Sequence, residues 1–91
     1  MKIELINGHF NGSEAIELLT HLIHVKIKFH ENKIKSDSNE EDIKYREKKI
    51  IQLQKNLFEV TRYIKSHDSG LVIQSDVNLV DVNEERKTTA A

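Results

Sequence analysis

The chain has 91 residues, of which 37% are hydrophobic and 32% charged, and its formal net charge is −1 at neutral pH. A chain of this length forms a single domain with a small core, so we expect it to need a partner chain or an internal staple. The absence of cysteine excludes disulfides and thiolate metal sites. No apolar run reaches the roughly 18 residues of a membrane-spanning helix. The nearly balanced charge gives no general reason to bind nucleic acid or an anionic membrane. We therefore expect a cytoplasmic protein that does not associate with membranes and needs no cofactor.

The first element is predicted to be a short strand over residues 2–6, because apolar and charged side chains alternate there. Two Asn-Gly pairs follow, at residues 7–8 and 11–12, and each indicates a turn. A helix is predicted over about 13–35. Ser13 is its expected N-cap, with Asn11 followed by Glu14 as a competing cap. Lys33 and Lys35 end this helix with the charge that its C-terminus favours.

A second helix is predicted over about 39–66, with Gly70 as its terminator. Ser38 followed by Glu41 has the spacing of a capping box. Because only about four residues separate the helices, they should fold back on each other as a long antiparallel hairpin.

Short strands are predicted over about 71–75 and 77–82, where β-branched and apolar residues cluster. They should lie at the open end of the hairpin, and residues 71–74 should pair with 2–6, either within one chain or between two chains. Residues 1–83 then form a single helical-hairpin domain. Residues 84–91 have no apolar pattern and are expected to form a disordered tail.

The apolar residues of the first helix form two stripes on a helical projection. Ile16, Ile23 and Ile34 belong to one stripe, and the second stripe lies about 120° away. The second stripe consists of Leu18, Leu22, Val25 and Phe29. One neighbouring helix covers an arc of about 100°, so this helix should contact at least two helices.

The second helix carries apolar residues at heptad spacing, which is typical of helix packing in bundles. These residues are Ile43, Ile50, Leu53, Leu57, Val60 and Ile64. Ile51 and Phe58 add an apolar flank about 100° away. Together with the second stripe of the first helix, these six residues are the predicted core and dimer interface. The predicted fold is mainly α: a helical hairpin that dimerises into a four-helix bundle.

Polar residues also fall inside the apolar arcs. Lys26 is expected to extend to the rim, while His30 and Gln54 are expected to form hydrogen bonds across the helix interface. An alternative reading is that His30 makes the bundle sensitive to pH.

Chemistry-bearing motifs are scarce in the sequence. Glu17, His21 and His24 are weak candidates for a metal site, and a solvated polar face is the favoured interpretation because no fourth ligand is identifiable. The sequence has no nucleophile elbow, zinc-protease motif or phosphate-binding glycine loop. We therefore expect no enzyme and no metal.

The charge distribution is the main functional hint. Residues 43–67 contain seven bases and two acids, a net charge of +5. Lys44, Lys48, Lys55 and Arg62 align on one side of the second helix and span about 27 Å. These four residues are candidates for contacting a partner or phosphate groups. The expected function is a non-enzymatic homodimeric interaction or scaffolding module, with another protein as a further partner. The alternative is an accessory or regulatory protein that binds nucleic acid through this stripe.

Overall fold

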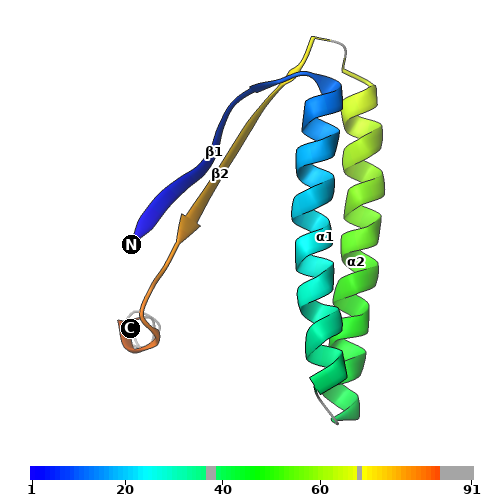
Figure 1. Ribbon diagram of the computed structural model, residues 1–91, viewed down its shortest axis with the longest axis vertical. Coiled ribbons are helices and arrows are strands. Elements are labelled where there is room, and N and C mark those ends of the chain that lie inside the picture. The colour runs from blue at the N-terminus through cyan, green and yellow to red at the C-terminus, as the bar shows by residue number, and fades with distance from the viewer. Residues whose placement is uncertain (37–38, 68, 85–91) are drawn as a thin grey trace.

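The computed structural model describes residues 1–36, 39–67 and 69–84. In chain order it contains strand β1 (Lys2–Phe10), helix α1 (Gly12–Ser36), helix α2 (Glu40–Lys65) and strand β2 (Leu71–Asn78). The helices form a long hairpin, and the two strands pair and extend away from its open end (Figure 1). The predicted mainly α fold with terminal strands is confirmed, and both helices match the predicted bounds to within one residue at each end.

Helix α1 begins with two reciprocal hydrogen bonds between Asn11 and Glu14. The Glu14 N–H donates to Asn11 Oδ1 at 2.8 Å, and the Asn11 N–H donates to Glu14 Oε1 at 3.0 Å. This capping box satisfies backbone donors that the first turn leaves free. The N-cap is therefore Asn11, and the expectation of Ser13 was wrong. Asn11 has an acid three residues later, whereas Ser13 has Ile16 at that spacing.

Helix α2 begins at Asn39, whose side chain accepts hydrogen bonds from the N–H groups of Glu41 at 2.9 Å and Asp42 at 3.4 Å. Asn39 is thus the N-cap, one residue after the Ser38 of the predicted capping box. Ser38 itself lies outside the described residues. The acids of the first turn of α2 complement the positive end of the helix dipole.

Helix α2 ends at Ser66, which is the C-cap and keeps a right-handed helical conformation. Gly70, which was predicted to terminate this helix, lies instead in the turn that precedes β2. Its φ of +90° leads the chain into β2, and a Cβ at this position would lie 3.1 Å from the carbonyl oxygen of Phe10. Both the backbone conformation and the close approach of β1 therefore favour glycine here.

Strands β1 and β2 form an antiparallel two-stranded sheet within one chain. Its register differs from the prediction, because residues 71–74 pair with 7–10, while 75–78 pair with residues 2–6 around a bulge at Leu5. The turn predicted at Asn7-Gly8 is therefore wrong. Asn7 lies opposite Gln74 and Gly8 opposite Ile73, so β2 provides an extended partner that local turn propensity does not reveal.

The C-terminal region contains one strand where two were predicted. Strand β2 is continuous from Leu71 to Asn78 and therefore includes residues 77–78. Residues 79–81 lie in no strand and residues 82–84 are helical, so the prediction of a separate strand over 77–82 is wrong. Backbone hydrogen bonds between Met1 and Leu79 extend the pairing by one step. Of the predicted tail over 84–91, residue 84 is helical and residues 85–91 lie outside the described residues.

The core of the single chain is small. Among the described residues, the buried side chains are Ile6, Ala15, His30, Leu53 and Ile64. The radius of gyration is 16.7 Å, whereas a compact domain of this length has about 12 Å. The accessible surface is 7579 Å², compared with about 5,500 Å² for a compact monomer of this mass. No helix in residues 1–36, 39–67 and 69–84 has the length and apolar character needed to cross a membrane.

Candidate interaction surface

The second apolar stripe of α1 is a regular exposed surface of the described chain. It consists of Leu18, Leu22, Val25 and Phe29, and we call it the α1 seam. Leu22 is 37% exposed, Val25 69% and Phe29 52%, while Leu18 is half-buried. The predicted split of the α1 apolar residues therefore corresponds to one covered stripe and one open stripe.

The six predicted interface residues of α2 have a different environment. Leu53 and Ile64 are buried, and Ile43, Ile50, Leu57 and Val60 are half-buried. They share one arc of the helix with Arg46, whose guanidinium contacts His30 of α1. This arc faces α1 of the same chain, so these residues form the core of the hairpin.

His30 forms a polar contact in the half of this hairpin core nearest the α1–α2 loop. The side chain is 7% exposed, and Arg46 Nη1 lies 3.0 Å from its Nδ1. Because a guanidinium has only donors, Nδ1 accepts, and the neutral ring carries its proton on Nε2. Nε2 is buried and has no hydrogen-bond partner among the described residues. The predicted hydrogen bond of His30 across the helices is thus present, whereas Gln54 is exposed.

The surroundings of His30 disfavour its protonation. Burial lowers the pKa of His30 below the ordinary value of 6.5, and the positive charges of Arg46, Lys26 and Lys49 lower the pKa further. A proton on this ring would lose its hydration and add a like charge to the group of cations. The imidazole is therefore neutral at physiological pH.

Cations also surround the exposed aromatic ring at the end of the α1 seam. Lys33 Nζ and Arg46 Cζ each lie 5.7 Å from the centroid of the Phe29 ring. Lys49 Nζ lies 5.3 Å from the centroid of Tyr45. These are cation–π distances, so the half of the seam nearest the α1–α2 loop is both apolar and positively charged.

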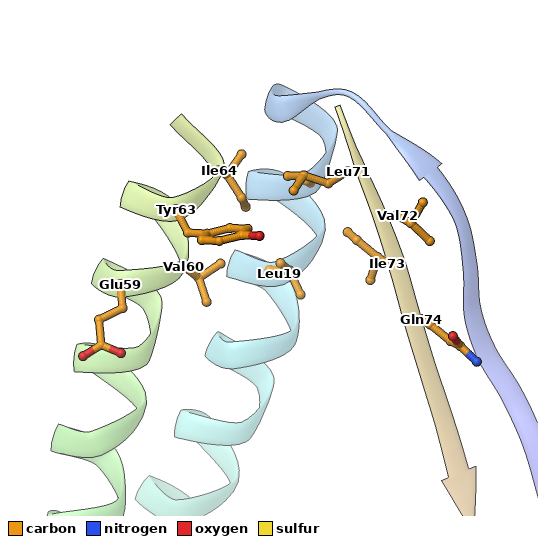
Figure 2. Close-up of a pocket in the computed structure, with 10 residues that line it drawn as sticks. Leu19, Glu59, Val60, Tyr63, Ile64, Leu71, Val72, Ile73 and Gln74 are labelled. Carbon is orange, nitrogen blue, oxygen red and sulfur yellow. The ribbon is translucent and has the colours of Figure 1, made fainter. Parts of the chain in front are cut away.

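An apolar cleft separates the sheet from the helices at the open end of the hairpin. Its volume is about 500 Å³, and its lining includes Leu19, Val60, Tyr63, Leu71 and Ile73. Leu71 and Ile73 lie on the side of β2 that faces the helices, and Val72 and Gln74 lie on the other side (Figure 2). The cleft adjoins the start of the α1 seam, since Ala15 also lines it.

The predicted basic stripe on α2 is exposed along its whole length. Lys44, Lys48, Lys55 and Arg62 are all solvent-exposed. The Arg62 guanidinium carbon lies 5.8 Å from the ring centroid of Phe58, which is 64% exposed. The stripe therefore combines positive charge with one accessible aromatic ring.

Glu17, His21 and His24 are all exposed on α1. Within the described residues, no group of three or more His, Asp or Glu side chains is placed to hold a metal ion. The three residues therefore lie on a solvated helix face.

The sequence did not reveal the cleft or the exposure of several apolar residues. The cleft depends on β2 packing beside α1 and α2, which involves residues distant in sequence. Ile3 and Leu5 of β1 and Tyr45 and Tyr63 of α2 are also exposed. The sequence indicated only that apolar and charged residues alternate along β1. This alternation assigns the apolar side chains to one face of a sheet, but it does not indicate what covers that face.

The chain matches no protein-family model, no curated protein and no solved structure.

Proposed function

We propose that the protein is a non-enzymatic interaction module whose folded unit is a homodimer formed through the α1 seam. The observation that carries this proposal is the exposure of a regular apolar stripe on a helix whose other apolar stripe is already covered. Soluble chains seldom leave such a continuous apolar surface open unless it binds a partner.

The size of the exposed surface supports a second chain as that partner. The accessible surface of 7579 Å² exceeds that of a compact monomer by roughly 2,000 Å². Obligate dimers bury about 2,000–5,000 Å² in total, or about 1,000–2,500 Å² for each chain. The excess, which also includes the surface of the diverging sheet (Figure 1), is therefore large enough to contain one side of a dimer interface.

The energy involved is also large for so short a chain. Fully burying a large apolar side chain contributes about 1.5–3 kcal/mol, and covering the part of each seam side chain that is still exposed contributes a fraction of that value. The total stability of a small domain is only about 5–15 kcal/mol. Dimerisation through the seam would thus add a substantial share of the stability.

The test is the solution mass of the protein by light scattering after size-exclusion chromatography, with the variants Val25→Glu and His24→Glu. Both positions are exposed, so neither substitution should disturb the hairpin. We expect about twice 10.6 kDa for the natural protein and for His24→Glu, and a monomer for Val25→Glu. A natural protein that remains monomeric at high concentration contradicts the proposal.

A second candidate function is nucleic-acid binding by the α2 stripe. It is favoured by the pairing of Arg62 with the exposed ring of Phe58, since single-stranded nucleic acids stack on such rings beside cations. Lys55→Glu should then weaken binding of an oligonucleotide at low salt, and Glu59→Gln should not. Absence of binding by the natural protein at low salt eliminates this candidate.

A further inference from the structure

The spacing of apolar residues along the α1 seam identifies the kind of surface that fits it. Leu18, Leu22, Val25 and Phe29 follow one another at intervals of four, three and four residues. This is the a and d pattern by which one α-helix packs against another in a coiled coil. The seam is therefore shaped for a helix, and its length from Leu18 to Phe29 is about 17 Å.

The sheet of the same chain does not provide this cover beyond the first turns of α1. Near the open end β2 lies against the helices, where Leu71 and Ile73 line the cleft together with Leu19. Farther along, the sheet diverges from α1 (Figure 1). Val25 and Phe29 lie beyond the cleft and stay exposed, so a helix from another molecule has access to them.

The charges of α1 are divided along its axis. Residues 12–23 contain Glu14 and Glu17 and no Lys or Arg, a net charge of −2. Residues 24–36 contain one acid, Glu31, and four lysines, a net charge of +3; the lysines are Lys26, Lys28, Lys33 and Lys35. The end of α1 nearest the sheet is therefore acidic and the end nearest the loop is basic.

We infer that the second copy docks with its α1 antiparallel to the first, seam against seam, with the two-fold axis midway between Leu22 and Val25. This inference rests on the proposed function and specifies how the two copies meet. In this arrangement the acidic half of each α1 faces the basic half of the other. A parallel arrangement would place the two basic halves together, with Lys26 and Lys33 of both copies around the same apolar contact.

The antiparallel arrangement also agrees with the helix dipoles and with the cations at Phe29. Antiparallel helices place the positive end of each dipole beside the negative end of the other. The basic group that includes Lys33, Arg46 and Lys49 would then lie at opposite ends of the dimer. Each group would face the acidic first turns of the other copy's α1.

The test measures the distance between the two copies by pulsed electron paramagnetic resonance. The chain contains no cysteine, so a single introduced cysteine carries the only spin label. The two variants are Lys26→Cys, close to the inferred axis, and Lys35→Cys, near the end of α1. Both lysines are exposed, and circular dichroism checks that each labelled variant keeps its helical content.

The antiparallel dimer predicts a short distance, below about 20 Å, for labels at position 26. For labels at position 35, eleven or twelve residues from the axis in each copy, it predicts about 35 Å. Short distances at both positions would indicate a parallel dimer and overturn the inference. A long distance at position 26 would place the contact elsewhere and also overturn it. If neither variant gives a measurable distance between labels on two molecules, and the mass is that of a monomer, the proposed function is overturned as well.

Discussion

Helices α1 and α2 have nearly the same length, 25 and 26 residues, but they use their apolar residues differently. The heptad residues of α2 are all buried or half-buried against α1. Helix α1 carries two apolar stripes, and α2 covers only one of them. Helix α2 also exposes apolar residues, and Ile51 and Phe58 form a short flank on one side of it. The heptad face of α2 is thus covered within the chain, whereas the α1 seam is left open.

The largest expected effect comes from removing a residue of the covered surface. Leu53→Ala should lower the free energy of unfolding by about 2–5 kcal/mol, because it deletes buried methyl groups and leaves a cavity. Val25→Ala, measured by urea denaturation at a dilution where the dimer has dissociated, should change it by about 0.5 kcal/mol or less. Equal losses for the two variants at that dilution would show that α1 and α2 do not differ in the way described.

A smaller effect is expected at the start of α1. Asn11→Ala removes the side-chain oxygen that accepts from the Glu14 N–H, and it should lower the free energy of unfolding by about 0.5–2 kcal/mol. Ser13→Ala is the matched variant, and it should change the value by about 0.5 kcal/mol or less. Thermal or urea unfolding of both proteins measures the difference. A larger loss for Ser13→Ala would mean that the helix is capped at Ser13.

The His30–Arg46 contact between α1 and α2 makes stability depend on pH. The pKa of His30 is lowered in the folded chain, so the unfolded chain binds a proton more readily as the pH falls. The free energy of unfolding is therefore highest above 6.5, the pKa of His30 in the unfolded chain. It falls progressively as the pH is lowered below that value. Urea unfolding across this range should show the decline in the natural protein.

The matched variants for this prediction are His30→Asn and His24→Asn. The first should lose most of the decline with falling pH, and the second should retain it, because His24 is exposed. If both variants follow the pH dependence of the natural protein, the decline arises from other groups.

The smallest expected effect concerns the charges around the α1 seam. Raising the salt concentration from about 0.05 to 0.5 M shortens the screening length several-fold. Because this weakens the attraction between the acidic and basic halves, the dissociation constant of an antiparallel dimer should rise severalfold. Glu17→Lys should weaken the dimer at low salt and reduce this dependence on salt. Sedimentation equilibrium measures the dissociation constant. A dimer that tightens as salt is added would indicate that like charges meet at the interface.

The sequence was sufficient to predict those parts of the fold that depend on local pattern. The two helices follow from heptad spacing, the capping residues and a short polar loop, and their bounds are correct to within one residue. The separation of α1 into two apolar stripes also follows from helical periodicity. Which stripe α2 covers depends on packing, and His30 meeting Arg46 could be established only from the structure.

The sheet was predicted less well because its pairing joins residues about 70 positions apart. Local propensity gave Asn7-Gly8 as a turn, but β2 pairs with both residues and extends β1 to Phe10. The bulge at Leu5 shifts the register between Glu4 and Ile6, and no pattern in the sequence marks it. The cleft beside Leu71 and Ile73 depends on the same long-range pairing.

The most direct test of whether a second copy covers the α1 seam is the reactivity of a thiol placed on it. Val25→Cys and His24→Cys place neighbouring thiols on the open stripe and on the solvated side of α1. The rate of modification by a maleimide reagent is measured over a range of protein concentrations. We predict that the Val25→Cys thiol becomes progressively protected as the concentration rises, while the His24→Cys thiol reacts at a constant rate. Equal rates that do not depend on concentration would contradict the account.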